Sequence, residues 1–155
     1  MERFDLRHVR QRKSCDCVVA TAAILANVPY EHAAALSPVV PGVRALKLVE
    51  TRRFFETLTG ISWNRPRYHW FTLLPSVTSE CASFVAVIRP SLLTTKYHCI
   101  FVEDLIVYDP ALHRPFPIDR YELRKWWIGF SMMPNDPGRL LAIQEFYGEK
   151  NGTRR

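Results

Sequence analysis

Cys17 lies where a short polar turn meets a run of small and apolar residues, in the segment from Gln11 to Asn27. The run is rich in strong helix formers, so the sequence predicts that Cys17 stands at the first turn of a helix. There, the free N–H groups and the positive end of the helix dipole stabilise a thiolate, which is the nucleophilic form of cysteine. This position suits covalent catalysis if the chain also supplies a base and an acid that orients it.

A base and an acid are predicted on one hairpin. Two β-rich runs, 97–102 and 105–108, are separated by residues 103–104. If residues 103–104 form the loop, His98 lies directly opposite Asp109, with Cβ atoms about 5 Å apart. A four-residue loop keeps this register, whereas a three-residue loop breaks the pair. A carboxylate that faces an imidazole selects one tautomer and stabilises the protonated ring.

Gln11 is a candidate for a fourth role, since it lies six positions before Cys17. Its side-chain N–H, beside the backbone N–H of the cysteine, is suited to bind the oxyanion of a tetrahedral intermediate. The chain thus contains a candidate nucleophile, base, orienting acid and oxyanion donor. Together they predict acyl chemistry at a thiol.

These residues and their neighbours resemble the papain-like superfamily of cysteine peptidases. The resemblance rests on Gln11, Asp16-Cys17 and Ala20, on His98 in a strand, and on the stretches 107–110 (Val-Tyr-Asp-Pro) and 126–130 (Trp-Trp-Ile-Gly-Phe). It is closest to the bacterial peptidases that remove double-glycine leader peptides in bacteriocin processing, and it spans residues 11–146. It implies an α+β domain of papain-like form, with N-terminal helices packed on a C-terminal antiparallel β-sheet.

By this resemblance Cys17 is the nucleophile, His98 the general base and acid, Asp109 the orienting acid and Gln11 an oxyanion donor. The implied activity is that of a free-standing enzyme that hydrolyses a peptide or isopeptide bond through a covalent acyl-enzyme. An acyltransferase with the same triad and a catalytically inactive papain-like binding module are the alternatives. Val18 favours the binding module, because it replaces the glycine that usually follows the nucleophile and would narrow the substrate cleft.

Helices are predicted first along the chain and strands second, which is an α+β pattern. Helices are expected at 17–26, 29–36 and 43–59, with Gly60 as the C-terminal cap of the third. Strands are expected at 61–63, 83–88, 97–102, 105–108, 115–118, 130–133 and 140–146, and a helix at 119–127 behind a capping box. The organisation is a basic arm (1–13), one papain-like domain (14–148) and a flexible basic tail (149–155).

Other residues compete for the catalytic roles. Cys15 is a second candidate nucleophile and could form a redox or metal pair with Cys17. Cys81 and Cys99 are expected to be small buried hydrophobes, with Cys99 facing away from His98 along its strand.

Two further histidines, His69 and His113, are alternative bases, but neither has so clear an acid partner in the sequence. Asp16 is expected to cap the helix that follows it. A zinc site formed by Cys17, His98 and Asp109 lacks a recognisable ligand spacing, so we expect no metal and no cofactor.

Composition limits the remaining function classes. A chain of 155 residues that is 48% hydrophobic fits one domain with a real core. Four cysteines are too few for a disulfide scaffold, and no apolar signal core or membrane-length run is present, so we expect a cytoplasmic protein. The net charge of +6 is dispersed and accompanies no nucleic-acid-binding motif. We therefore expect a peptide or protein substrate rather than nucleic acid, and an acidic partner stays open. The sequence does not indicate an oligomeric state.

Overall fold

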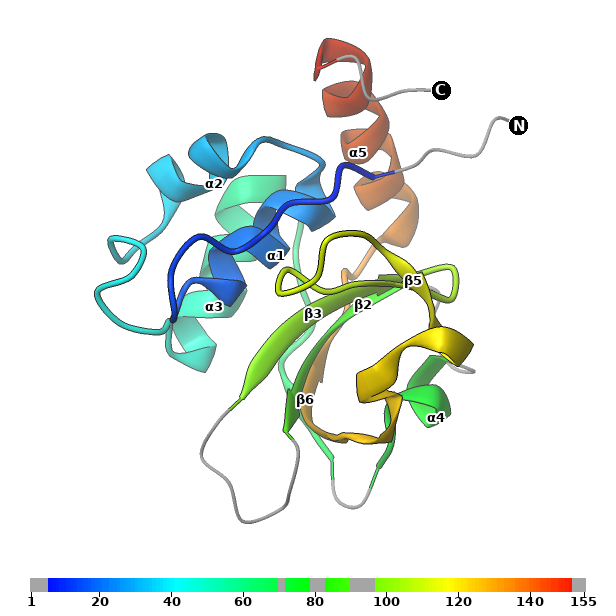
Figure 1. Cartoon of the computed structure of the whole chain (residues 1–155). Helices are drawn as coiled ribbons and strands as arrows, with labels where there is room; N and C mark the ends of the chain where they lie inside the picture. Colours follow the sequence, from blue (N-terminus) through cyan, green and yellow to red (C-terminus); the bar gives the residue numbers. More distant parts are fainter. Residues whose placement is uncertain (1–5, 70–71, 79–82, 90–96, 152–155) are drawn as a thin grey trace.

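Helices and sheet form two layers in the computed structural model (Figure 1). The structure describes residues 6–69, 72–78, 83–89 and 97–151. Four helices gather on one side of the sheet, and the short helix α4 (Leu74–Thr78) lies on the other. The four are α1 (Cys17–Ala26), α2 (Tyr30–Leu36), α3 (Leu48–Thr59) and α5 (Pro137–Asn151). The expected α+β class is confirmed.

The described strands form one six-stranded antiparallel sheet in the order β1-β6-β2-β3-β4-β5. Because β2 pairs with both β6 and β3, it lies inside the sheet, whereas β5 is an edge strand, where its proline is tolerated. The strands are β1 (Arg67–Tyr68), β2 (Ser83–Arg89), β3 (His98–Glu103), β4 (Ile106–Tyr108), β5 (Phe116–Pro117) and β6 (Trp127–Met132).

Two apolar cores flank the sheet, and side chains alternate between them along each strand. On β3, Cys99 and Phe101 pack with the helices, while Ile100 and Val102 pack in the opposite core. Helix α1 is buried at every position after Cys17, as its apolar sequence predicts. Cys17 is therefore the partly exposed first residue of a rigidly packed helix.

The β3–β4 hairpin differs in register from the predicted one. Asp104 and Leu105 form its two-residue loop, and Phe101 pairs with Tyr108, a shift of two residues. Both loop residues have positive φ, as a type I′ turn requires. Because side chains alternate with a period of two, an even shift leaves each residue on its expected face. His98 and Asp109 therefore share a face as diagonal, not direct, neighbours.

Replacing Leu105 by glycine is expected to stabilise the protein. Leu105 is 55% exposed with φ of 66°, a conformation that costs an ordinary residue about 1 kcal/mol and glycine little. Glycine also loses more backbone entropy on folding, so the expected net gain is about 0.5 kcal/mol in the free energy of unfolding, measured by urea denaturation. Leu141→Gly is the control, because this partly exposed leucine lies in helix α5 and should cost about 1 kcal/mol. A lower free energy of unfolding for Leu105→Gly as well would contradict the backbone strain inferred at Leu105.

The predicted strand at 140–146 is wrong, because this segment belongs to helix α5. The Asp136 side chain accepts the N–H of Arg139 at 3.1 Å, and Pro137 is the first helical residue. Most of the buried and half-buried residues of the helix recur at helical spacing: Leu140, Ile143, Gln144, Tyr147 and Gly148.

Helix α5 also changes the expected tail, since it runs to Asn151 and makes the first residues of segment 149–155 helical. At 15 residues it is the longest described helix. None of the described helices is long and apolar enough to cross a membrane.

The third predicted helix is shorter than expected and begins at Leu48 rather than at residue 43. The Glu50 carboxylate accepts the backbone N–H of Lys47 at 2.8 Å, which fixes the first turn there. Gly60 caps the other end with φ of 69°, as predicted.

Two smaller predictions are also wrong. Segment 119–127 forms two 3₁₀ turns, Ile118–Arg120 and Glu122–Lys125, because Trp127 pairs with Arg89 and begins β6. Segment 61–63 contributes one isolated bridge, from Trp63 to Pro134, rather than a strand.

The described part of the N-terminal arm is packed onto the domain. Leu6 and Val9 are buried in the helical core. The N–H of Arg7 donates to the Asn27 side chain at 2.8 Å, which anchors the arm at the C-terminal end of α1. The arm thus runs along the domain and delivers Gln11 to the turn before Cys17.

Candidate active site

His98, the first residue of β3, is paired with Asp109, which directly follows β4. Nε2 of His98 lies 2.5 Å from Oδ1 of Asp109. The N–H of Ala111 donates to the same oxygen at 2.8 Å, and the Tyr121 hydroxyl donates to Oδ2 at 2.6 Å. Burial alone raises the pKa of Asp109, but the hydrogen bonds from His98, Tyr121 and Ala111 hold it below its ordinary value. Asp109 is therefore an ionised acceptor that fixes the imidazole.

Cys17 lies close enough to the same imidazole to be one of the groups that raise its pKa. Because Asp109 occupies Nε2, Nδ1 is the nitrogen left for the sulfur. Burial lowers the pKa of His98, but the hydrogen bonds to Asp109 and Cys17 outweigh it and raise the pKa to about 9. At neutral pH a ring with this pKa carries a proton. The structure thus brings Cys17, His98 and Asp109 together, with His98 hydrogen-bonded to Asp109 and next to Cys17.

Gln11 is held at the same end of the domain by its backbone. Its N–H donates to the carbonyl of Pro110, the residue after Asp109, at 2.9 Å. The next N–H along the arm, that of Arg12, donates to Asp16 at 3.1 Å and closes the turn before Cys17. The side-chain Oε1 of Gln11 is buried without a hydrogen-bond partner among the described residues. No hydrogen bond from a described residue to Oε1 therefore fixes this side-chain amide in place.

Asp16 does not cap α1, contrary to expectation. Its carboxylate makes no hydrogen bond to the first turn of the helix, because Oδ2 is engaged by the Tyr30 hydroxyl at 2.6 Å and by Arg12. The Arg12 guanidinium lies 4.2 Å from the centre of the Tyr30 ring. Burial and the contact with Asp16 raise the pKa of Tyr30, so the hydroxyl stays a donor. Asp16 thus fastens the cysteine turn to helix α2.

An apolar cavity of about 180 Å³ lies beside Cys17. Val18, which the sequence suggested would narrow the cleft, is only 8% exposed and forms part of the wall. The lining residues come from α1, the loop before α3, α3, the sheet and the residue before β3: Cys17, Val18, Ala45, Leu46, Leu48, Thr51, Val87, Tyr97, Cys99 and Phe130. The space accepts an apolar side chain next to the nucleophile.

The other cysteines lack this setting. Cys15 is half-buried and does not line the cavity. Cys99 lines it but is 1% exposed, and burial raises the pKa of its thiol. It packs in the helical core, as expected of a small buried hydrophobe. Cys81 lies outside the described residues.

The two alternative histidines also lie elsewhere. His69 is buried, with Nε2 2.7 Å from the Ser131 hydroxyl. His113 is exposed in the loop that follows Asp109. Among the described histidines, the pair with Asp109 thus distinguishes His98 as the candidate base.

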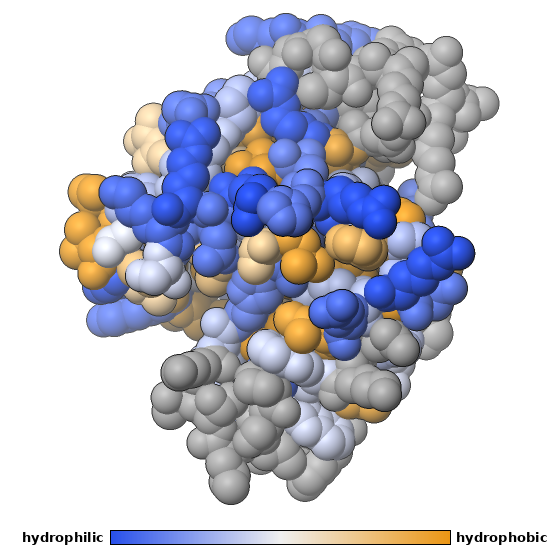
Figure 2. Space-filling model, viewed as in Figure 1, coloured by the Kyte–Doolittle hydropathy of each residue, from blue (hydrophilic) through white to orange (hydrophobic). Residues whose placement is uncertain are grey.

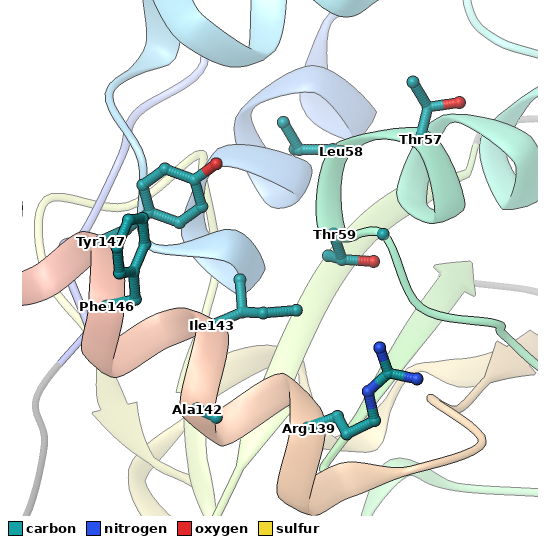
Figure 3. A pocket seen from close by; sticks show the side chains of 9 residues that line it. Thr57, Leu58, Thr59, Arg139, Ala142, Ile143, Phe146 and Tyr147 are labelled. Atoms are coloured by element: carbon teal, nitrogen blue, oxygen red, sulfur yellow. The ribbon is translucent and has the colours of Figure 1, made fainter.

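A larger hollow of about 490 Å³ lies away from Cys17, between the C-terminal end of α3 and helix α5 (Figure 3). Its lining contains one charged side chain, that of Arg139, and no cysteine, histidine or carboxylate. The lining residues are Thr57, Leu58, Thr59, Gly60, Arg139, Ala142, Ile143, Phe146 and Tyr147. This hollow lacks a nucleophile and a base, so the smaller cavity is the better candidate for chemistry.

Tyr121 belongs to the site but was not found from the sequence. It is fully buried, and burial together with Asp109 raises the pKa of its phenol, which keeps the hydroxyl a donor. The sequence signal at 119–122 resembled a helix cap, and nothing in it indicated a contact with Asp109. Tyr121 is a positioning residue, because it acts on His98 through the carboxylate.

Replacing Tyr121 by phenylalanine is expected to lower kcat/KM by about tenfold, because one donor to the Asp109 carboxylate is lost. Losing that donor raises the pKa of Asp109, so the acid limb of the pH profile should move to higher pH. Tyr68→Phe is the control, since Tyr68 is exposed on the edge strand β1. A lower melting temperature with an unmoved pH profile would show a merely structural role.

The assignment of the site rests on its geometry, because the chain matches no protein-family model and no curated protein. Among the described residues, no group of three or more histidine, cysteine or acidic side chains is arranged to hold a metal ion. The fold and site therefore define an α+β domain with a linked cysteine, histidine and aspartate.

Proposed function

We propose that this chain is a papain-like cysteine peptidase that hydrolyses a peptide or isopeptide bond. The observation that carries the proposal is the hydrogen-bonded pair of His98 and Asp109 with Cys17 beside the imidazole. Three further features support it: the helix N-terminus at Cys17, the apolar cavity beside it, and Gln11 at the same end of the domain. Each corresponds to a part that thiol catalysis requires.

Acylation begins with the proton of Cys17 on His98. The sulfur attacks the carbonyl carbon, a C–S bond forms, and the carbonyl oxygen becomes an oxyanion. The backbone N–H of Cys17 and the side-chain amide of Gln11 donate to that oxygen. The intermediate collapses by breaking the C–N bond, and His98 gives its proton to the leaving amine. The product of this half-reaction is a thioester on Cys17.

Deacylation reverses the roles with water in place of the amine. His98 accepts a proton from water as the oxygen attacks the thioester carbon, the C–S bond breaks, and a carboxylic acid leaves. Asp109 stays ionised throughout and keeps the ring oriented. An amine acceptor in place of water would give acyl transfer, which the mass of the product distinguishes.

Labelling with a thiol-directed electrophile tests the proposal. A chloroacetamide probe at pH 7 should give one adduct by intact mass, and peptide mapping should place it on Cys17. The rate should exceed that of a free thiol, because His98 stabilises the thiolate. A library of peptides then identifies a cleaved sequence. An adduct on Cys15 instead, or labelling no faster than a free thiol, would overturn the proposal.

A further inference from the structure

The N-terminal arm and the loop after Asp109 lie side by side. The N–H of Gln11 donates to the Pro110 carbonyl at 2.9 Å, and Nε2 of His8 lies 2.7 Å from the Leu112 carbonyl. Two segments that are far apart in the sequence thus form one continuous surface. This surface begins at the candidate oxyanion donor and at the residue after the orienting acid.

This surface is strongly basic. Its exposed basic side chains, here called the basic strip, are Arg10, Arg12, Lys13, His113 and Arg114. Figure 2 shows intensely hydrophilic side chains across the middle of this face, over the arm.

The carboxylates in segments 6–17 and 109–114 are Asp16 and Asp109. Both are 1% exposed and both accept hydrogen bonds inside the domain. They therefore do not balance the exposed cations of the strip.

Most of the cations in the strip are available to a partner. Arg12 is paired with Glu31 at 2.6 Å, and Arg114 lies 4.9 Å from the centre of the Phe116 ring. Arg10, Lys13 and Arg114 form no ion pair among the described residues. Lys13 is also held in place: a Cβ at Gly42 would lie 2.3 Å from its Cδ, so the lysine stem packs directly on that glycine. A packed stem loses less entropy when its ammonium binds a carboxylate.

The strip lies within reach of the nucleophile. Lys13 is four residues from Cys17, so their Cα atoms are at most about 14 Å apart, and Arg114 is at most about 18 Å from Asp109. An extended peptide covers about 3.3 Å per residue, so a substrate at Cys17 meets the strip within roughly six residues. The strip and the apolar cavity share no lining residue, so one substrate can occupy both.

We infer that the substrate is a polypeptide with an apolar side chain in the cavity beside Cys17 and an acidic stretch, within about six residues of the scissile bond, on the basic strip. The inference rests on the proposed peptidase function. A peptide fits better than nucleic acid, because segments 6–14 and 110–114 contain no phenylalanine, tyrosine or tryptophan on which bases could stack. The neighbouring rings of Tyr30 and Phe116 are covered by Arg12 and Arg114.

Peptides of matched sequence and different charge test this inference. The cleaved library sequence is prepared with four Glu, four Gln or four Lys beside the scissile bond, on either side of it. For one of the two placements, kcat/KM for the Glu peptide should be about fivefold above that for the Gln peptide at low salt, and the Lys peptide should be poorest. The advantage should vanish at about 0.5 M sodium chloride, where charges are screened. Equal rates for Glu and Gln peptides in both placements would overturn the inference.

Charge-reversing substitutions in the basic strip test whether the strip causes the preference for the Glu peptide. The double variant Arg10→Glu/Arg114→Glu should lose the preference for the Glu peptide over the Gln peptide. The double variant Arg53→Glu/Arg65→Glu changes the net charge equally, at exposed arginines outside the strip, and should keep it. Equal loss in both variants would show an effect of net charge alone and would overturn the assignment.

Binding to Cys17→Ala separates the two hypotheses. Fluorescence anisotropy with a labelled Glu peptide needs no turnover, so it reports on the strip even if Cys17 fails to react with the electrophile. Weaker binding after Arg10→Glu/Arg114→Glu supports the strip, whereas equal binding of Glu and Gln peptides overturns it. A twelve-nucleotide single-stranded RNA that binds more tightly than the Glu peptide would also overturn it, in favour of nucleic acid.

Discussion

Replacing Cys17 by alanine is expected to abolish cleavage of the best library peptide, with kcat/KM falling by at least roughly a thousandfold. The reason is chemical, since without the sulfur no C–S bond forms and no acyl-enzyme exists. The fold should survive, because the position is the partly exposed first residue of α1 and alanine is the best helix former. Cleavage is measured by fluorescence of a quenched peptide, and the fold by circular dichroism.

Cys15→Ala is the matched control for this prediction. Cys15 is also half-buried and free, but it lies in the turn outside the apolar cavity. The variant should keep both cleavage and labelling at near the rates of the original protein. If Cys17→Ala kept activity and Cys15→Ala lost it, Cys15 would be the nucleophile. The proposed triad of Cys17, His98 and Asp109 would then be wrong.

The hairpin shows why the contact of His98 with Asp109 could be predicted although its register could not. The sequence sets which residues share a face, because alternation of side chains depends on residue parity alone. It does not set the loop, since Glu103-Asp104 and Asp104-Leu105 are both two-residue choices. The structure selects Asp104 and Leu105 although both must then adopt positive φ. The predicted pair survived because the two registers differ by an even number of residues.

The segments predicted wrongly are those in which tertiary contacts decide between alternatives. Residues 140–146 contain apolar side chains that suit either a strand or a helix, and only the packing of Leu140 in the helical core resolves the choice. Tyr121 was missed for a related reason. Its hydroxyl reaches an acid twelve residues earlier in the chain, and no local pattern reports such a contact.

The sequence also did not indicate which basic side chains lie together on one surface and can bind a partner. The sequence has a net charge of +6 with basic residues dispersed along the chain, which is typical of a solvated surface. Only the hydrogen bonds of Gln11 and His8 to the loop after Asp109 place the arm cations and Arg114 on one surface. The burial of Asp16 and Asp109 then leaves that surface without exposed carboxylates of its own segments.

Replacing Asp109 by asparagine is expected to lower kcat/KM by about a thousandfold while the protein remains folded. Asparagine has nearly the same shape, so packing in this buried site is kept, although its single carbonyl oxygen can accept from Ala111 or from Tyr121 but not from both. A neutral amide, however, no longer stabilises the imidazolium and can present an N–H where His98 needs an acceptor. The ring then adopts the tautomer that cannot accept the Cys17 proton. Tyr121→Phe, which keeps the carboxylate, should retain far more activity.

The pH dependence of Asp109→Asn distinguishes lost charge from damaged structure. In the original protein burial lowers the pKa of His98, but the hydrogen bonds to Asp109 and Cys17 raise it to about 9. Removing the carboxylate lets burial count for more, so the alkaline limb of kcat/KM should move to lower pH. An unmoved limb with the same loss of activity would contradict an electrostatic role for Asp109.

The pH dependence of the free energy of unfolding also reports on the pair of His98 and Asp109. A histidine whose pKa is raised on folding contributes stability that is fully present below its unfolded value, about 6.5, and is lost as the pH rises through its folded value, about 9. The free energy of unfolding of the original protein should therefore fall between pH 6.5 and 9 by more than that of Asp109→Asn. Urea denaturation across this range measures both slopes. Parallel slopes would mean that His98 is not held as an imidazolium by Asp109, and the catalytic role of the pair would have to be abandoned with it.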